Sequence, residues 1–331
     1  MFLAGKKVIK SLLLIIILSW AVEFNVPNAL AENSLSCPKE MVYIPGGTFR
    51  MGSERQDFLE ERAVDDVTVD SFCIDSHEVT NEEFSRFVEE TGYLTVAERP
   101  LSKEQFPDLS EAERKPGSLV FQPPEKGLKE VPYLSWWHWV RGANWQHPYG
   151  ADSNIEGKKN HPVVHIAYED AVAYARWAGK QLPTEAQWEY AARGGFQEQE
   201  YTWGNEYSAQ KANTWQGIFP FFNTKKDGYL GTAPVASFPP NGYGLYDLTG
   251  NVWEWTQDWY QVERKTMAHQ KNPQGPNQGY DPKKPNDKLV HVIKGGSHLC
   301  APNYCSRYRP AARESQSSDT GTTHIGFRLV M

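Results

Sequence analysis

Cysteine is scarce in this chain, since only four of its 331 residues are Cys. Lysines and arginines form no cluster and the formal net charge is -7, so a nucleic-acid-binding surface is not expected. The chain lacks a P-loop, a Gly-x-Ser-x-Gly elbow and a dinucleotide-binding glycine fingerprint, which argues against the enzyme classes that use them. It also lacks internal repeats and linker-like stretches. We therefore expect one domain after any targeting segment.

Glycine, proline and tryptophan are abundant instead. The chain has 26 Gly, 22 Pro and 12 Trp, and 13% of its residues are aromatic. This composition, with few long apolar runs, predicts a loop-rich domain around an aromatic core rather than a helical bundle or a doubly wound sheet. Four tryptophans are expected mainly in that core: Trp136, Trp137, Trp139 and Trp145.

The first 31 residues have the pattern of a cleaved secretory signal. Three lysines at 6, 7 and 10 precede an apolar run at 12–22, and the stretch 29–31 offers small residues for cleavage. The run is shorter than the ~20 residues of a membrane-spanning helix. We expect a mature chain of residues 32–331 without a membrane anchor, exported to a periplasmic or extracellular compartment that favours disulfides.

Cys37 and Cys73 accompany two predicted strands near the start of the mature chain. Cys37 precedes a strand and turn at 41–47, and Cys73 lies in an alternating stretch at 67–74. In an exported protein we expect these two cysteines to form a structural disulfide. In the chain-entropy account that bond would contribute roughly 3–4 kcal/mol.

The other two cysteines, Cys300 and Cys305, follow a predicted strand at 289–293 and a Gly-Gly turn. Pro302 and Asn303 interrupt regular structure between them, so we expect a bent loop that can bring both sulfurs together. Three interpretations stay open on this basis: a structural disulfide, a pair of inert thiols, or a soft-metal site. Two thiolates without a nearby third ligand suit Cu(I) better than four-coordinate zinc.

Capping patterns predict helices. A capping box at 80–83 begins a helix that Gly92 ends, and a second box at 184–187 begins one that ends at 193–195. A further helix is expected over 169–178, closed by Gly179.

Oxygen-bearing side chains recur in turns between positions 213 and 254. They are Asn213, Asp227, Asp247, Asn251 and Glu254. Hard cations such as calcium take their ligands from irregular loops of this kind. The same residue types also form ordinary turns, so both interpretations stay open here.

Several motifs together resemble those of the formylglycine-generating enzymes, also called sulfatase-modifying factors. The matching segments are 41–47, 78–81, 142–148, 161–165, 182–190, 212–217, 239–246, 250–255, the two-cysteine loop 294–309 and the terminal 326–328. The resemblance covers the mature chain from position 37 to 331. Its most discriminating feature is the cysteine pair after Gly-Gly-Ser.

The resemblance implies an α+β fold: one compact domain with little regular secondary structure, of the duplicated C-type-lectin-like kind. It implies a copper-dependent oxidase that converts the cysteine of a Cys-x-Pro-x-Arg sulfatase segment to Cα-formylglycine with dioxygen and a thiol reductant. Cys300 and Cys305 would hold Cu(I), and the substrate thiolate would complete a three-sulfur site. Ser297 and Trp253 match the family's active-site serine and tryptophan. The implied partner is an unfolded or nascent sulfatase polypeptide, and the enzyme would act as a monomer.

Motif positions of the family also imply two calcium sites. The first would use Asn213, Thr214, Asp227 and Tyr229, and the second Asp247, Gly250, Val252 and Glu254.

Two positions are implied to contact the substrate. Arg309 matches an arginine near the substrate. His324 stands where well-known members carry asparagine, and Ala301 stands where they carry histidine. Both departures flank the substrate groove, so the family's peptide preference does not carry over directly.

Two other functions compete with this one. A non-haem iron oxygenase, such as a sulfoxide synthase, needs two histidines and a third ligand. The close pair here is His161 and His165, and an extended segment separates them by about 13 Å, so both are interpreted as structural. A non-catalytic lectin-like binding module would have no reason to place two cysteines after Gly-Gly-Ser.

Overall fold

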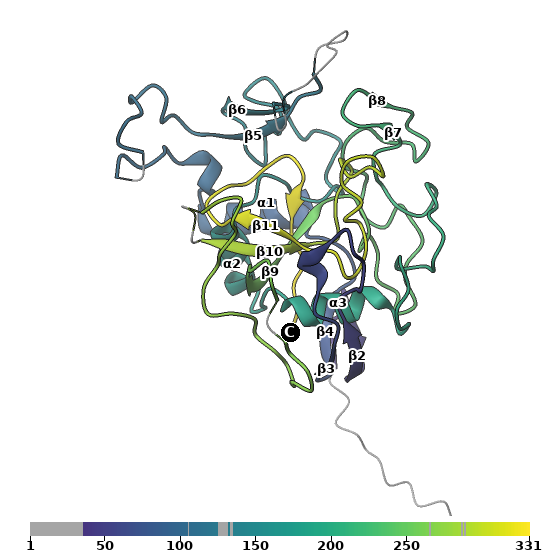
Figure 1. Ribbon diagram of the computed structural model, residues 1–331. Coiled ribbons are helices and arrows are strands. Elements are labelled where there is room, and N and C mark those ends of the chain that lie inside the picture. The colour runs from purple at the N-terminus through teal and green to yellow at the C-terminus, as the bar shows by residue number, and fades with distance from the viewer. Residues whose placement is uncertain are drawn as a thin grey trace, which may run out of the picture. The chain divides into compact units, whose positions relative to one another are not determined.

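Short strands and helices are set in long irregular connections in the computed structural model (Figure 1), which describes residues 36–104, 106–124, 132, 135–264, 266–285, 287 and 289–331. The predicted signal at 1–31 lies outside these residues. The helices are α1 (Asn81–Thr91), α2 (Tyr168–Trp177) and α3 (Glu185–Arg193), with 3-10 turns η1 (Leu59–Glu61) and η2 (Val96–Glu98). The strands are β1 (Met41–Ile44), β2 (Gly47–Met51), β3 (Asp65–Val69), β4 (Phe72–Asp75), β5 (Gly117–Phe121), β6 (Trp137–Arg141), β7 (Gly217–Ile218), β8 (Phe222–Asn223), β9 (Trp253–Trp259), β10 (Val290–Lys294), β11 (Glu314–Ser317) and β12 (Ile325–Gly326).

The capping boxes form as predicted. The Thr80 hydroxyl accepts the Glu83 N–H at 3.2 Å, and Gly92 ends α1 in the left-handed conformation. Thr184 caps α3 in the same way. The predicted strand at 67–74 is wrong as one element, because the chain turns between β3 and β4. β3 pairs with β2, whereas β4 pairs with β1.

A four-stranded sheet in the order β11-β10-β9-β12 lies at the centre of the fold. β10 is antiparallel to β9 and β11, and β12 is parallel to β9. Lys294, at the end of β10, is paired with Glu254, and Ile325 is paired with Trp253. The start of β9 and the end of β10 are therefore neighbours, which brings Trp253 close to the loop that follows β10.

The core is aromatic, as the composition predicts. Its largest cluster packs Phe84, Phe87, Trp145 and Tyr174 with aliphatic side chains from the central sheet. Trp136 is also buried, whereas Trp139 is 41% exposed. Residues 35–331 form one compact unit of mixed helix and sheet, which confirms the predicted α+β class.

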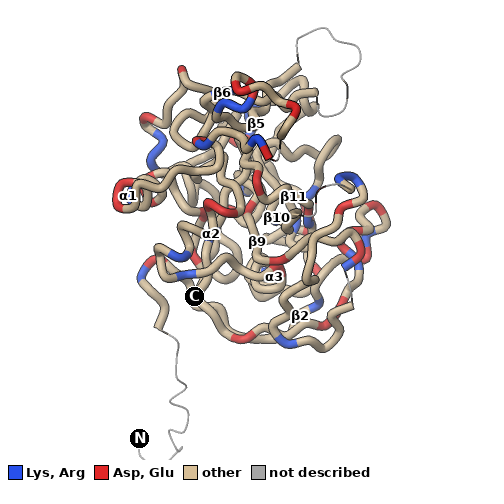
Figure 2. Tube along the Cα trace, turned by 90° about the vertical axis from the view of Figure 1, so that its left-hand side faces the viewer, with Lys and Arg blue, Asp and Glu red and all other residues tan. Residues whose placement is uncertain are grey.

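The predicted disulfide between Cys37 and Cys73 is present, with a Cα–Cα distance of 5.6 Å. It ties the segment before β1 to β4, the strand that pairs with β1. Acidic and basic residues are interspersed along the chain trace in Figure 2. Within the described ranges, no helix combines the length and apolarity needed to cross a bilayer.

Candidate active site

Cys300 and Cys305 lie side by side on the loop that follows β10. Both thiols are free, and Cys300 is only 2% exposed whereas Cys305 is partly buried. The N–H groups of Tyr304 and Cys305 both donate to the Ala301 carbonyl, at 3.0 and 2.9 Å, and this closes a tight turn. The two side chains form a hydrogen bond to each other. The predicted bent loop is confirmed, and the structure has no disulfide at this pair.

The two thiols differ in acidity. Burial raises the pKa of Cys300 well above its ordinary value, and the neighbouring Cys305 sulfur raises it further. The hydrogen bond from Cys300 lowers the pKa of Cys305, and the backbone N–H and positive charge of Arg307 lower it further against the effect of burial. The pair thus offers two neighbouring sulfurs of unequal acidity, a soft donor set that fits Cu(I).

Sequence reasoning missed Arg307. Its Nε lies 3.1 Å from a carboxylate oxygen of Glu60 and 3.2 Å from one of Glu314, and its guanidinium lies over the Phe58 ring at 5.0 Å. These contacts fix a positive charge near Cys305. The available signal in the sequence was its position two residues after Cys305, a candidate metal ligand.

A glycine turn leads from β10 into the cysteine loop. Gly296 has φ +71°, and a Cβ there would lie 2.8 Å from the Tyr308 Cα, so this position requires glycine. The next residue, Ser297, is fully buried, and its hydroxyl accepts the Leu299 N–H at 3.2 Å. The Ser297 carbonyl accepts the Cys300 N–H at 2.9 Å. The structure therefore holds Ser297 in direct contact with the first cysteine's backbone.

Aromatic side chains surround the sulfurs. Trp253, Tyr308 and Cys300 belong to one buried cluster, and Cys305 packs against it. The Tyr308 ring stacks with Tyr201 at 6.1 Å. The structure thus places the predicted Trp253 in the same buried cluster as Cys300, and Ser297 next to the Cys300 backbone.

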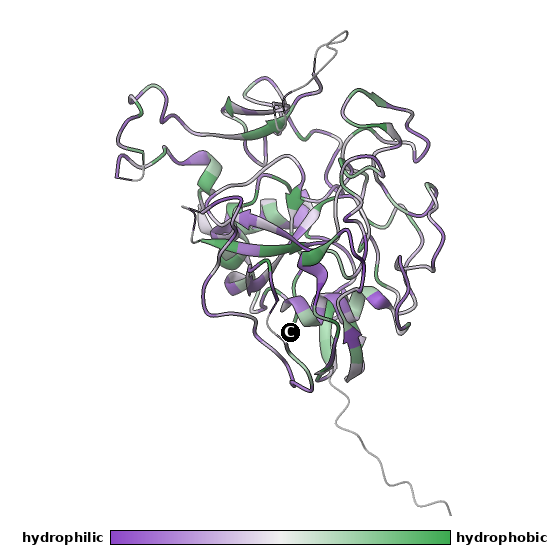
Figure 3. Cartoon of the chain, viewed as in Figure 1, coloured by the Kyte–Doolittle hydropathy of each residue, from purple (hydrophilic) through white to green (hydrophobic). Residues whose placement is uncertain are grey.

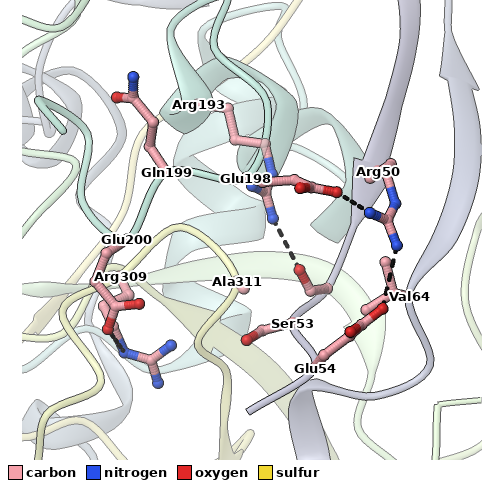
Figure 4. Close-up of a pocket in the computed structure, with 11 residues that line it drawn as sticks. Arg50, Ser53, Glu54, Val64, Arg193, Glu198, Gln199, Glu200, Arg309 and Ala311 are labelled. Carbon is pink, nitrogen blue, oxygen red and sulfur yellow. Dashed lines mark hydrogen bonds and ion pairs between the residues drawn. The ribbon is translucent and has the colours of Figure 1, made fainter. Parts of the chain in front are cut away.

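Arg309 is held by a buried acidic residue, Glu61. Its guanidinium forms a buried two-point ion pair with Glu61, one bond being 2.8 Å long, and lies 4.6 Å from the Phe58 ring centre. It lines a hollow of about 190 Å³ together with Glu200 (Figure 4). Neither cysteine lines that hollow. A direct contact of Arg309 with substrate therefore stays a prediction.

His324 lies among aromatic and histidine side chains. Its ring is 4.8 Å from that of Trp137, and its Nδ1 is hydrogen-bonded to the Thr322 hydroxyl. Burial lowers the pKa of His324 well below its usual value, and the nearby His298 and His165 lower it further. His324 is thus a neutral side chain at neutral pH, and its role with substrate stays a prediction.

The histidines at 161 and 165 have separate partners. His161 Nδ1 contacts the Thr232 hydroxyl at 2.9 Å, whereas His165 bonds Ser118 at 2.8 Å. This is the arrangement of structural histidines. Among the residues that the structure describes, no three His, Cys, Asp or Glu side chains are placed to share one ion.

The first predicted calcium set is partly assembled. The Asp227 carboxylate accepts the N–H groups of Thr214 and Tyr229, both at 3.1 Å. Burial raises the pKa of Asp227. The Asn213 amide instead donates to Asn251 at 3.1 Å. Any cation here would depend on carbonyl and amide oxygens with one carboxylate, a donor set that fits calcium.

The second set includes two buried carboxylates in one electrostatic neighbourhood. Burial raises the pKa of Asp247 to about 6, although its Oδ2 accepts the Ala236 N–H at 2.7 Å. Glu254 binds Arg328 through two bonds of 2.7 Å and also accepts the Trp188 indole N–H. Because Arg328 already occupies Glu254, this carboxylate is less available to a cation than its position in the motif implies. Gly250 and Val252 lie in the turn between the two carboxylates.

A third carboxylate, Glu78, lies in the same neighbourhood and was not predicted. Burial raises its pKa well above the usual value, and Asp247 raises it further. Its Oε1 accepts a bond from Asn251 at 3.1 Å, and its Oε2 has no hydrogen-bond partner among the described residues. A bound cation would satisfy that oxygen. The available signal in the sequence was an acidic residue just before the capping box of Thr80 and Glu83, which forms without it.

Comparison with known proteins agrees with the motifs. Residues 27–331 match the sulfatase-modifying factor enzyme 1-like domain family. Several relatives are called formylglycine-generating enzyme, and the one from Mycobacterium tuberculosis is 49% identical, covering 88% of this chain and 97% of that protein. A Bos taurus relative called inactive C-alpha-formylglycine-generating enzyme 2 is 38% identical, covering 87% of this chain and 86% of that protein.

Solved structures agree on the fold. The structure of PvdO from Pseudomonas aeruginosa is 25% identical, with a TM-score of 0.54, and the match covers 88% of this chain and 93% of that one. The low helix content, the short strands and this likeness are consistent with the C-type-lectin-like fold. The chain belongs to the sulfatase-modifying factor enzyme 1-like family, which includes the formylglycine-generating enzymes.

Proposed function

We propose that this chain is an oxidase that converts a cysteine of a sulfatase polypeptide to Cα-formylglycine, as the names of its relatives indicate for them. The observation that carries the proposal is the free, touching pair Cys300 and Cys305, in a chain whose other two cysteines are bonded to each other. A binding module gains nothing from two contacting thiols on a glycine-led loop.

The reaction balances with a thiol reductant. One cysteine side chain, one dioxygen and two reductant thiols give one aldehyde, one hydrogen sulfide, one water and one disulfide. The substrate loses a Cβ–H bond and its C–S bond, and a C=O bond forms. Dioxygen accepts four electrons, two from the substrate carbon and two from the reductant thiols. The reductant has to be available wherever the enzyme works.

We assign each residue of the site a separate role in this reaction. Cys300 and Cys305 would hold Cu(I), which when bound supplies the centre at which dioxygen is reduced. The Cys300 side chain, and after it Arg307, lower the pKa of the Cys305 thiol. Ser297 fixes the backbone of Cys300, and Trp253 belongs to the buried cluster that includes Cys300. Burial limits side reactions of a reactive sulfur.

Further features belong to the same proposal. We propose that the target is a Cys-x-Pro-x-Arg segment of an unfolded chain, with Arg309 and His324 near it. We propose calcium at both oxygen-rich turns. Export through a signal at 1–31 completes the proposal.

Copper binding tests the proposed site directly. The Cys300→Ser, Cys305→Ser double variant is compared with wild type and with Ser306→Ala, a change in the same loop. Wild type and Ser306→Ala should bind one Cu(I) per chain in competition with a colorimetric chelator, and the double variant none. Zinc should bind poorly to all three. Copper binding that survives loss of both cysteines would contradict the site.

Turnover tests the activity itself. The purified protein is incubated with Cu(I), a thiol and a Cys-x-Pro-x-Arg peptide, and the products are analysed by mass spectrometry. Wild type and Ser306→Ala should convert the peptide thiol to an aldehyde that reacts with hydrazine probes. A copper-loaded wild type that never yields aldehyde would favour a binding role.

A further inference from the structure

The β7–β8 hairpin exposes three large apolar side chains close to the cysteine loop. Ile218, Phe221 and Phe222 are 62%, 50% and 61% exposed, and these three are called the hairpin patch. Hydrophobic positions of the hairpin are green in Figure 3. In Figure 1 the hairpin lies beside segments of the yellow C-terminal part of the chain. Grouped exposed apolar side chains mark interaction sites more often than single ones do.

The hairpin is fastened to the cysteine loop at several points. Asn303, which lies between the two cysteines, donates to the Phe219 carbonyl at 3.1 Å and accepts the Phe219 N–H at 3.2 Å. The Tyr304 ring stacks on the Phe219 ring, with centres 4.3 Å apart. The Trp215 N–H donates to the Cys300 carbonyl at 2.9 Å. The hairpin patch is therefore held in a fixed position relative to both sulfurs.

The turn of the hairpin packs into a buried cluster beside Cys300. Phe219 in this turn and Trp215, just before β7, are buried with Leu299 and Ala301, the two neighbours of Cys300 in the chain. Gly217, the first residue of β7, adopts φ +146°, and a Cβ there would lie 2.4 Å from the Phe222 carbonyl oxygen, so the close pairing of the two strands requires glycine at this position. A buried, packed turn lets the exposed side chains contact a ligand without a large ordering cost.

We propose that the hairpin patch binds apolar side chains of the substrate polypeptide that flank the cysteine to be modified. This rests on the proposed function, since it assigns part of the same substrate's binding. Cys305 is joined to the patch through its neighbour Tyr304, which stacks on Phe219, and Phe219 lies between Ile218 and Phe221 in the chain. An unfolded chain exposes apolar side chains that its folded form buries, so such a patch also favours unfolded over folded substrate.

A second copy of this chain fits the patch less well. Tyr304 and Asn303 connect the patch directly to the cysteine loop, so a copy seated on it would cover the loop that substrate has to reach. A patch continuous with the sulfurs is suited to the molecule that approaches the sulfurs. The protein should therefore be monomeric with its patch exposed.

Binding of labelled peptides tests this without turnover. Each peptide carries serine in place of the target cysteine. One is the Cys-x-Pro-x-Arg core with polar flanks, and two others add six residues with alternating leucines, before or after the core. The proteins are wild type, Ile218→Ser/Phe222→Ser and Leu94→Ser, a control whose side chain is 59% exposed elsewhere. Fluorescence anisotropy gives Kd, and thermal melting checks the fold.

The proposal expects one leucine-containing extension to bind wild type more tightly than the core does. The Kd of the double variant for that leucine-containing peptide should be about tenfold higher than that of wild type, equivalent to about 1.4 kcal/mol. Its Kd for the core peptide should be unchanged. Leu94→Ser should behave as wild type. Equal binding of all peptides to wild type and double variant would overturn the proposal, as would a wild-type dimer that the double variant converts to monomer. Absence of aldehyde from a peptide that keeps the target cysteine, measured separately in the turnover assay, would instead refute the activity and leave the binding comparison interpretable.

Discussion

The buried ion pair between Arg309 and Glu61 allows structure and substrate binding to be separated. Both side chains are almost completely buried and meet through two bonds. Replacing Arg309 by methionine leaves the Glu61 carboxylate buried without its cation. Removing one partner of a buried pair typically costs about 3–5 kcal/mol. For a domain of this size the melting temperature should fall by roughly 6–20 °C.

The control and the compensating variant sharpen this prediction. Arg50 lines the same hollow (Figure 4), but its ion pairs are exposed, so Arg50→Met should cost no more than about 1 kcal/mol. The double variant Arg309→Met/Glu61→Leu replaces the pair by apolar groups and should recover at least half of the loss. Denaturant unfolding followed by tryptophan fluorescence measures all of these free energies.

Activity then identifies any substrate role of Arg309. If the arginine also contacts substrate, the restabilised double variant should keep a raised KM for the Cys-x-Pro-x-Arg peptide. A restored KM would make Arg309 a purely structural residue. A loss below about 1 kcal/mol in Arg309→Met, or a double variant no more stable than the single one, would refute the ion-pair reasoning.

Three further predictions concern metal, thiols and pH. EDTA should lower the melting temperature and calcium restore it, because ligands that bind only the folded state stabilise it; an unchanged curve in calcium-free protein would favour ordinary turns. After mild reduction, alkylation should mark Cys305 first and then Cys300, as peptide mapping would show, whereas marking of Cys37 and Cys73 would contradict the assignment. Burial and the nearby Glu185 raise the pKa of Asp258 to about 7, so its folded form keeps a proton that the unfolded form loses near pH 4. The contribution of Asp258 to the free energy of unfolding should therefore fall from about pH 4 to 7 and then level off. In denaturant titrations, Asp258→Asn should flatten the dependence of that free energy on pH over this range. An unchanged slope would contradict the reasoning.

Local signals were sufficient for several elements of the fold. Capping boxes use hydrogen bonds within four residues, so Thr80 and Thr184 predicted the starts of α1 and α3. The break between β3 and β4 could not be predicted, because each of these strands is fixed by a different distant partner. Alternating apolar residues look the same on either side of such a break.

In the site, too, local features could be predicted from the sequence, whereas features that depend on distant residues could not. Gly296 and the residues between the cysteines predicted the bent loop, because turn chemistry is local. Arg307 acquires its role only when Glu60, far away in the sequence, anchors its guanidinium. Glu78 becomes significant only when folding buries it beside Asp247. Long-range electrostatics of this kind arise from the fold and leave no periodic pattern in the sequence.

The stoichiometry of oxygen use tests the central claim most directly. With Cu(I), excess thiol and a Cys-x-Pro-x-Arg peptide, an oxygen electrode and mass spectrometry follow dioxygen and aldehyde together, after subtraction of the peptide-free rate. Wild type should consume one dioxygen for each aldehyde formed, and the variant without Cys300 and Cys305 should form no aldehyde. Aldehyde formation that persists in this variant, or that proceeds in wild type without dioxygen, would contradict the account.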